Sequence, residues 1–598
     1  MHPTRQLKAV VLATLLFSTG LLFLSCQKQL TEDISASNLS GDITTRVTAS
    51  VSGFVIDENN TAVQNASVQF GNQSTTTDKY GYFSVDGATV VQNAAFLTVT
   101  KAGYFKGIKT FIAQKIRKAF FRIKLIPKNL SGTISGSGGG TVSLSNGLSI
   151  SLPANAVVTA SGGSAYTGPV RVAAYHINPV ATDLDMIMPG DLRGINTSGE
   201  IKLLKTYGMA AVELTGASGE LLQIATGKKA TLSLPVPSSL LGDAPPAIPL
   251  WYFDETNGLW KEEGTATKTG SNYVGEVAHF SYWNCDYPVP DPVLMDATIV
   301  NSSGAPVPYA SVWIDYAGGT STGCHGLTDI NGTVQGIVPG NSQLVMKIST
   351  FTCQGTSLYS QPFTTSNTNI SLGNITLPAS SNTTVSGTVV NCSGQPVTNG
   401  YIMVMNNPYY WNRYNFSGAT GNFTSTVLAC QPAAVIIIPG DLSNNQEGNP
   451  LTVNVQPGNN TAVGTITACG NANAEFINYS VDNVPYSLTV PAATMYQSVY
   501  PLGNPTEEQI WGYQGNSFAN VFFTHTNIAP NSSQNLIGFT CSQVTDSLAA
   551  ASPVPVAITE YGSVGGFIAG NFSGTLHSVW NPAITHAVIC SFRIRRQY

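Results

Sequence analysis

The sequence predicts an all-β chain of tandem β-sandwich domains carried on an N-terminal tether. The chain has 598 residues, too many for one hydrophobic core, so four or five domains are expected. Only 10% of the residues are charged and 42% are apolar, and long amphipathic helical runs are missing. Short segments alternate apolar and polar residues between polar turns, which is typical of strands with one buried face.

The first 25 residues have the order of a secretion signal. Arg5 and Lys8 form the charged start, and the apolar run Ala9–Leu24 follows. The end of this run, Phe23-Leu24-Ser25-Cys26, resembles a bacterial lipobox with Phe at its first position. This resemblance implies a lipid on Cys26, where each buried methylene would contribute about 0.8 kcal/mol to membrane anchoring. The alternative is a secreted protein with a chance cysteine.

The polar residues 26–49 lack periodicity and are expected to form a flexible tether that joins the lipid-anchored Cys26 to the folded body. Removal of residues 1–25 would leave 25 basic and 32 acidic residues, a net charge of −7. This balance argues against a nucleic-acid partner.

One stretch, residues 101–128, departs from this balance, with nine Lys and Arg and no acid. Part of it alternates strictly, as in Arg122-Ile123-Lys124-Leu125. We expect a strand whose basic side chains point to its outer face and prevent pairing with another chain. Contact with an anionic glycan or with lipopolysaccharide is the alternative.

Besides Cys26 the chain has eight cysteines, an even number that favours disulfides in an exported protein. No C-x-x-C occurs, so neither a redox site nor a zinc ribbon has support. We expect no metal site and no cofactor in this chain. We predict the pairs Cys324–Cys353 and Cys541–Cys590, because each falls within one candidate domain. Three connectivities stay open for the remaining four, which are Cys285, Cys392, Cys430 and Cys469.

A strand–turn–strand pattern recurs three times, as VSGFVIDENNTAVQNASVQF from Val51, MDATIVNSSGAPVPYASVWIDY from Met295 and VSGTVVNCSGQPVTNGYIMVM from Val385. The first two copies continue into T-D-x-x-G, whereas the third has Gly418 in place of the Asp. These segments resemble the carboxypeptidase regulatory-like domain, a small transthyretin-like β-sandwich. The resemblance implies sandwiches at residues 50–128, 291–380 and 381–470, with a turn in the third copy that differs.

Such domains accompany metallocarboxypeptidases, whose zinc site needs His-x-x-Glu and a distant His. None of the seven histidines of this chain has Glu three residues later. We therefore expect no peptidase and interpret the repeated domains as spacers or binding surfaces.

Residues 129–290 carry a different signature. The segment GGGTVSLSNGLSISLPANAVV resembles the β domain shared by ankyrins and netrin receptors, through Gly139, Gly140, Leu152, Pro153 and Ala156. The end of the region, PLWYFDETNGLWKEEG and onward, is similar to cartilage intermediate layer proteins. This resemblance implies a further β-rich domain.

Residues 471–598 are expected to form a closing β-sandwich or roll, since apolar alternation continues to the end of the chain. The region resembles a C-terminal domain of exported Bacteroidota lipoproteins. Its last strand, SFRIRR, is expected at a sheet edge, with Arg593, Arg595 and Arg596 pointing outward.

The triplet His279-Phe280-Ser281 allows a chemical interpretation. In a self-cleaving subset of the netrin-receptor-type families the same triplet breaks its own chain. Mapped here, Ser281 would attack the Phe280 carbonyl in an N-to-O acyl shift while His279 takes the proton. The alternative is a simple buried strand.

An aromatic run suggests binding instead. Tyr409, Tyr410, Trp411, Arg413 and Tyr414 follow a strand, and exposed rings beside Asn and Arg would make a stacking platform for sugars or a protein ligand. The alternative is a loop packed on a neighbouring domain.

Together these features predict a non-catalytic cell-envelope lipoprotein of a Bacteroidota-like bacterium. We expect it in the outer membrane, anchored through Cys26 and facing the periplasm or the outside. Its expected role is binding or scaffolding, with carbohydrate as the favoured ligand class. The alternative function is self-processing between Phe280 and Ser281.

Overall fold

The computed structural model is all-β, as the sequence predicts. It describes residues 42–597 except 116, 290–291, 319–322, 351–356, 380–382, 408–409, 445, 470–474, 483, 491–492, 501–505, 530–531, 545, 551, 562–563 and 565–566. Within these residues, strands alternate with turns, and a single four-residue helix, α2 (Leu184–Ile187), is present. In the same part of the chain, no helix has the length and apolar character needed to cross a membrane.

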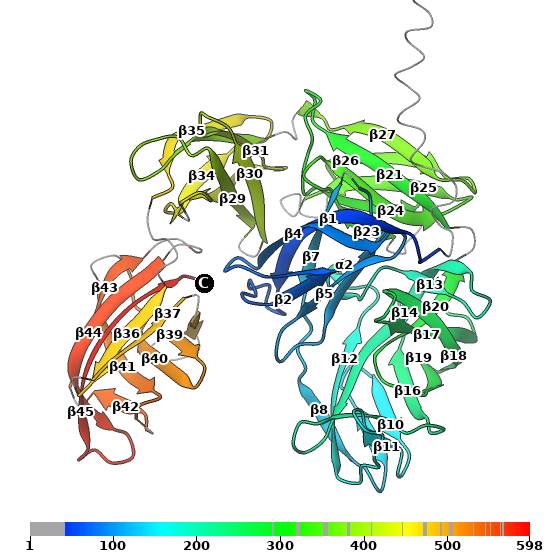
Figure 1. The fold of residues 1–598 in the computed structure, drawn as a ribbon, viewed down its shortest axis with the longest axis horizontal. Helices are drawn as coiled ribbons and strands as arrows, with labels where there is room; N and C mark the ends of the chain where they lie inside the picture. The colour runs from blue at the N-terminus through cyan, green and yellow to red at the C-terminus, as the bar shows by residue number, and fades with distance from the viewer. Residues whose placement is uncertain are drawn as a thin grey trace, which may run out of the picture.

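The strands group into five stretches, which we call modules 1 to 5 (residues 46–124, 130–289, 292–376, 384–467 and 476–595; Figure 1). The strands of module 1 are β1 (Arg46–Ile56), β2 (Ser67–Phe70), β3 (Gln73–Thr76), β4 (Tyr82–Val91), β5 (Ala95–Thr100), β6 (Gly107–Phe111) and β7 (Lys118–Lys124). Strand β1 reaches back to Arg46, so the expected tether ends earlier than residue 49.

Modules 3 and 4 repeat the arrangement of module 1. The strands of module 3 are β21 (Pro292–Val300), β22 (Ser311–Tyr316), β23 (Cys324–Leu327), β24 (Thr333–Pro339), β25 (Gln343–Ser349), β26 (Tyr359–Thr364) and β27 (Ile370–Thr376). Those of module 4 are β28 (Thr384–Val390), β29 (Asn399–Asn407), β30 (Tyr410–Ser417), β31 (Asn422–Thr426), β32 (Ala433–Asp441), β33 (Gln446–Glu447), β34 (Leu451–Val455) and β35 (Asn460–Thr467).

In each of these three modules the first strand lies at the centre of a three-stranded sheet, in the orders β4-β1-β7, β24-β21-β27 and β31-β28-β35. It pairs antiparallel with one neighbour and parallel with the last strand of its module. The second sheets are β3-β2-β5-β6, β23-β22-β25-β26 and β30-β29-β32-β33, the last with β34 beside β32. The sequence repeat is thus a repeat of topology.

The structure explains why the repeat contains a glycine. This glycine lies in the turn that follows the first hairpin of the second sheet. Gly81, Gly332 and Gly421 have φ of 72°, 73° and 68°. A Cβ on any of them would lie 2.2–2.4 Å from a carbonyl oxygen of the module's first strand, so only glycine fits. In module 4 the Gly421 carbonyl still accepts from the Val389 N–H at 2.8 Å. This backbone bond therefore forms even though Gly418 replaces Asp there.

Module 2 is a 13-stranded, strongly bent sheet. Its strands are β8 (Leu130–Ser135), β9 (Gly140–Ser143), β10 (Ser149–Leu152), β11 (Val157–Thr159), β12 (Pro169–Ile177), β13 (Arg193–Ile195), β14 (Ile201–Thr215), β15 (Leu221–Ile224), β16 (Ala230–Pro235), β17 (Ala247–Asp254), β18 (Leu259–Thr269), β19 (Asn272–Val277) and β20 (Tyr282–Val289). Trp251, Trp260 and Trp283 are fully buried. These large rings fill its two cores.

Module 5 is a ten-stranded sheet. Its strands are β36 (Phe476–Val481), β37 (Val484–Thr489), β38 (Thr494–Tyr500), β39 (Glu507–Gln514), β40 (Ser517–Thr524), β41 (Ser533–Cys541), β42 (Leu548–Ala550), β43 (Pro555–Tyr561), β44 (Phe567–Ser578) and β45 (Thr585–Arg595). The expected edge position of the last strand is wrong, because β45 lies between β36 and β44. The Arg595 side chain is buried rather than outward.

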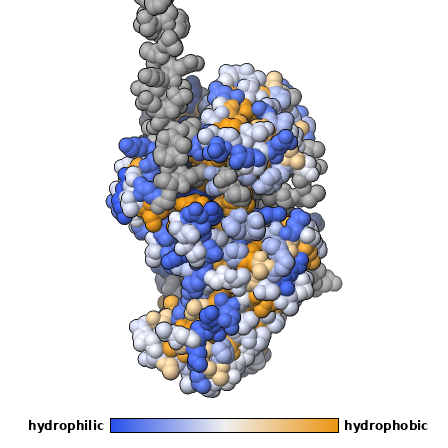
Figure 2. Space-filling view, turned by 90° about the vertical axis from the view of Figure 1, so that its right-hand side faces the viewer, coloured by the Kyte–Doolittle hydropathy of each residue, from blue (hydrophilic) through white to orange (hydrophobic). Residues whose placement is uncertain are grey.

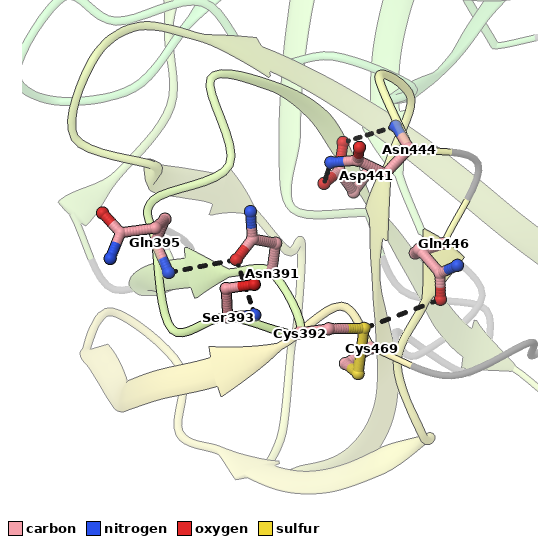
Figure 3. Close-up of a disulfide and its surroundings, with 8 residues drawn as sticks. All are labelled: Asn391, Cys392, Ser393, Gln395, Asp441, Asn444, Gln446 and Cys469. Atoms are coloured by element: carbon pink, nitrogen blue, oxygen red, sulfur yellow. Dashed lines mark hydrogen bonds between the residues drawn. A yellow bond between two sulfur atoms is a disulfide. The ribbon is translucent and has the colours of Figure 1, made fainter.

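A disulfide joins Cys392 and Cys469 across module 4 (Figure 3). Cys392 lies in the turn after β28, where the Asn391 side chain accepts the backbone N–H of Ser393 and Gln395. The bond closes a separation of 77 residues. Such a loop stabilises the fold by about 4 kcal/mol in the chain-entropy model.

Both predicted cysteine pairs are wrong. Cys324 is a free thiol, and its expected partner Cys353 lies outside the described residues. Cys541 and Cys590 are free and buried in the core of module 5. Their strands, β41 and β45, are not neighbours in the sheet. Of the cysteines left open, Cys285 is free and buried, and Cys430 is disulfide-bonded.

Two lysines of the basic stretch, residues 101–128, pair with acids of module 2 rather than facing solvent as expected. Lys124 Nζ lies 2.8 Å from an Asp183 carboxylate oxygen, and Lys128 Nζ lies 2.7 Å from one of Glu213. Both acids belong to module 2. Part of the positive charge that the sequence concentrates in residues 101–128 therefore joins this stretch to module 2.

A buried carboxylate joins modules 1, 4 and 5. Glu447 of β33 is 2% exposed and accepts hydrogen bonds from Lys79 Nζ (3.1 Å) and Tyr80 Oη (2.6 Å) of module 1. Arg595 Nη2 of module 5 donates to the same oxygen at 3.1 Å. We call Lys79, Tyr80, Glu447 and Arg595 the charge junction. Burial alone would raise the pKa of Glu447, but Arg595 and Lys79 outweigh it and lower the pKa.

Replacing Glu447 should destabilise the assembly of modules strongly. E447A removes the buried carboxylate that Arg595 and Lys79 share, a change that costs about 3–5 kcal/mol. We expect urea unfolding to begin at lower concentration and a protease to separate module 5 from module 4. The control is E276A, because Glu276 is 65% exposed and lies 3.5 Å from Lys229. An exposed pair contributes at most about 1 kcal/mol, so equal effects of the two variants would contradict the junction.

Candidate functional site

The triplet His279-Phe280-Ser281 lies in a bend between β19 and β20, so the buried-strand interpretation is wrong. The Ser281 hydroxyl donates to the Tyr282 carbonyl at 3.2 Å. The His279 ring packs against Trp283, with centroids 5.1 Å apart. The structure therefore gives the hydroxyl and the imidazole separate partners.

The peptide group at Phe280 is held by one side chain. Gln223 Oε1 accepts the Phe280 N–H at 2.8 Å, and Gln223 Nε2 donates to the Phe280 carbonyl at 3.1 Å. Burial lowers the pKa of His279, which favours the neutral ring that a base needs. Removal of the Ser281 proton also needs a hydrogen bond between the two groups, however, and the hydroxyl donates elsewhere.

The predicted aromatic platform is wrong, because its described side chains are buried between modules. Tyr409 lies outside the described residues, as does the side chain of Tyr410. Trp411 and Tyr414 are 9% and 8% exposed. The Trp411 ring lies 5.0 Å from Tyr80 of module 1, and Tyr414 lies 5.4 Å from Tyr309 of module 3.

Arg413 completes this interface. Its guanidinium lies over the Tyr401 ring at 4.0 Å and 3.8 Å from an Asp78 carboxylate oxygen of module 1. Tyr309 Oη donates to the Arg413 carbonyl at 2.6 Å. The run Tyr410–Ser417 is thus a contact between modules 1, 3 and 4, which is the alternative that the sequence left open.

A row of partly exposed aromatic rings lies instead on one face of the sheet of module 5. Tyr496 of β38 is directly opposite Trp511 of β39, with ring centroids 4.5 Å apart and planes at 25°. The Tyr513 ring lies 6.0 Å from Tyr496 at 17°. Trp511, Tyr513 and the neighbouring Phe518 are 37%, 39% and 43% exposed. We call Tyr496, Trp511, Tyr513 and Phe518 the aromatic row.

The local sequence explains the row. Trp511 and Tyr513 are two residues apart in a strand, so both point to the same face. The register places Tyr496 opposite Trp511, and Phe518 opposite Tyr513. The spacing W-x-Y was visible in the sequence. What sequence reasoning missed was that Trp511, Tyr513 and Phe518 stay partly exposed on this face.

Polar groups surround the row. Ser498 Oγ and Asn520 Oδ1 are buried and lack a hydrogen-bond partner within the described residues. Burial raises the pKa of Tyr496, and charges on Tyr513 and on Tyr104 and Asp57 of module 1 raise it further. A ligand on this face would therefore meet the aromatic rings, whereas Ser498 Oγ and Asn520 Oδ1 lie beneath the surface.

A second constellation lies where modules 2 and 3 meet. Ser311 Oγ is 2.6 Å from His325 Nε2, and His325 Nδ1 is 2.7 Å from Asp185 Oδ2. The His325 ring stacks on Trp313 at 4.1 Å. The order of hydroxyl, imidazole and carboxylate is that of a serine hydrolase.

The strand that carries Ser311 does not suit acyl transfer. Strand β22 is an inner strand, paired with β23 on one side and β25 on the other, so its N–H groups are used in the sheet. An oxyanion hole needs free N–H groups next to the nucleophile. We therefore interpret Ser311, His325 and Asp185 as a hydrogen-bonded link between two modules. In the described residues, no cluster of three or more His, Cys, Asp or Glu could hold a metal ion.

Comparison with known proteins shows a local similarity. The chain is 33% identical over 109 residues to cartilage intermediate layer protein 2 of Mus musculus, which is 18% of this chain and 9% of that protein. It is 32% identical over 121 residues to the Homo sapiens protein, 20% of this chain and 10% of the relative. The matches thus span about a tenth of these relatives. No family model matches the chain.

Solved structures show less likeness. The shaft pilin SpaA of Lactobacillus rhamnosus GG is 7% identical, with a TM-score of 0.17, over 30% of this chain and 97% of the pilin. The Bacillus anthracis TIE protein is 10% identical, with a TM-score of 0.15, over 72% of this chain and 68% of that chain. Values this low support no inference. The similarity to cartilage intermediate layer proteins is the expected one, and the other resemblances stay predictions.

The geometry at Ser281 predicts that the purified protein stays intact. We expect one full-length band on a denaturing gel after days at neutral pH, and no change on replacing Ser281 with Ala. Gel mass and N-terminal sequencing measure this. A fragment that begins at Ser281 and disappears in S281A would contradict the interpretation.

Proposed function

We propose that this protein is a non-catalytic cell-envelope lipoprotein whose modules form a scaffold for a carbohydrate-binding face. Cys26 would carry the lipid that anchors it in an outer membrane. The modules then hold the aromatic row of module 5 away from the lipid. The observation that carries the proposal is the stacking of the Trp511 and Tyr513 rings, which are 37% and 39% exposed, beside the partly exposed Tyr496 ring at interplanar angles of 25° and 17°.

The chemistry of the row favours sugars. A pyranose ring presents an apolar face of C–H groups and a rim of hydroxyls. Flat aromatic rings cover the apolar face, and the Tyr hydroxyls offer partners for the rim. Exposed large rings of this kind are costly in water unless they serve contact with a ligand.

The scaffold supports the row in two ways. Trp511 and Tyr513 lie on β39, a strand paired on both sides, so their backbone positions are fixed. Module 5 is tied to modules 1 and 4 by the charge junction. A net charge of −5 for the whole chain disfavours nucleic acid as the ligand.

Loss of one ring should weaken glycan binding. An aromatic pair contributes about 0.5–1.5 kcal/mol beyond its buried area. We therefore expect W511A to reduce affinity about tenfold and the W511A/Y513A double variant to abolish retention. A glycan array would select the polysaccharides, and affinity electrophoresis in gels containing them would measure the change.

The matched control is W580A. Trp580 is 86% exposed but lies in the turn between β44 and β45, outside the aromatic row. It should retain wild-type binding. The proposal fails if no glycan binds the wild-type protein, or if W511A and W580A behave alike.

Replacing Cys26 should release the protein from the membrane. Without the thiol no acyl chain can be attached, so C26S loses the anchoring energy of the lipid. Expressed with residues 1–25 in a diderm bacterium, the wild type should sediment with outer membranes and incorporate labelled palmitate. C26S should appear in the soluble periplasmic or culture fraction. Palmitate incorporation by C26S, or no incorporation by the wild type, would contradict anchoring at Cys26.

A further inference from the structure

A cavity of about 350 Å³ lies where modules 1, 2 and 3 meet. Small-molecule sites in proteins have volumes of about 300–1,000 Å³. Its apolar lining comes from all three modules and includes Phe121, Leu184, Met188, Trp313 and Ile337. Figure 2 shows one face of the molecule, on which apolar residues form patches among hydrophilic ones. The cavity is thus lined largely by carbon atoms, like a site for an apolar ligand.

The charged residues of the lining leave one positive charge in excess. Four are basic and three are acidic, namely Lys109, Arg117, Arg122, Arg193, Asp185, Asp191 and Asp329. Three of the basic side chains have partners. Lys109 Nζ donates to the carbonyls of Asp185 and Met188, Arg122 donates to Asn412, and Arg193 pairs with Asp191.

Arg117 is different. Its Nη1 atom is buried and lacks a hydrogen-bond partner within the described residues. Two carboxylates, Asp329 and Asp296, are near enough to feel its charge. Neither carboxylate accepts a hydrogen bond from Arg117 Nη1, since Asp329 Oδ1 accepts the N–H groups of its own turn and Asp296 Oδ2 accepts from Ser371. A buried guanidinium nitrogen without an acceptor is costly unless an anion completes it.

We propose that this cavity binds a small amphipathic carboxylate, with its apolar body among the carbon-lined walls and its carboxylate on Arg117. A planar guanidinium matches a carboxylate with two parallel hydrogen bonds, which an alcohol of the same length cannot form. The Ser311–His325–Asp185 link closes one wall, because Asp185 and His325 both line the cavity. This site is separate from the aromatic row and does not depend on carbohydrate binding.

The test uses decanoate and decanol as probes on the full mature protein. Cys324 lines the cavity, whereas the other free thiols, Cys285, Cys541 and Cys590, are at most 1% exposed. Protection of Cys324 from N-ethylmaleimide, read by peptide mass, therefore reports occupancy. Burial raises the pKa of Cys324 to about 11, so the reaction is run at pH 9 for sufficient thiolate. Calorimetric titration gives the dissociation constants independently.

We expect decanoate to protect Cys324 saturably and to bind about tenfold more tightly than decanol or better. R117Q should bind decanoate only as well as decanol, and R117K should fall between, since it keeps the charge without the planar fork. The control is K118Q, because Lys118 pairs with Asp86 outside the cavity. It should bind as the wild type does. Absence of saturable binding, equal binding of the two probes, or unchanged decanoate binding by R117Q would each overturn the proposal.

Discussion

The buried carboxylate of Glu447 is the constraint on which the arrangement of the modules depends. A carboxylate that is 2% exposed is stable only if cations and hydroxyls complete it. Module 4 supplies the acid, while Lys79 and Tyr80 come from module 1 and Arg595 from module 5. No single module satisfies the site. The charges therefore favour one relative placement of three modules, which apolar contact alone would specify less sharply.

Module 1 is the centre of this arrangement. Its basic residues meet acids of module 2, and Phe120 lies 4.5 Å from Tyr309 of module 3. Phe54, Tyr80 and Phe120 form one cluster with Met403, Met405 and Trp411 of module 4. The three repeats of the same small sandwich thus have different positions in the structure. The first is covered by its neighbours, and the surfaces that remain open belong largely to the others.

This distribution separates structural aromatic residues from those available for binding. Trp411 and Tyr414 look like binding residues in the sequence, yet they fill the space between modules. Trp511 and Tyr513 have the same chemistry and remain exposed because their sheet face is not covered to the same extent. The cavity at Arg117 also depends on how the modules pack, since residues of three modules line it. Both proposed sites therefore follow from how the modules pack.

The sequence by itself determined the features that depend on neighbours along the chain. Alternation predicts strands, and the repeated turn with Gly81 and Gly332 predicts three equivalent sandwiches, because sterics within a few residues decide both. Only the tertiary structure decided which faces are covered. Alternation along a strand shows that the side chains of Lys124 and Arg595 point to the same face as the residues two positions away. It does not show that Asp183 lies opposite Lys124 or that Glu447 lies opposite Arg595. Likewise an even number of cysteines predicts disulfides, whereas the distance between strands selects Cys392 and Cys469. Contacts between residues far apart in the chain are set by the packing of whole modules, and no local pattern carries that information.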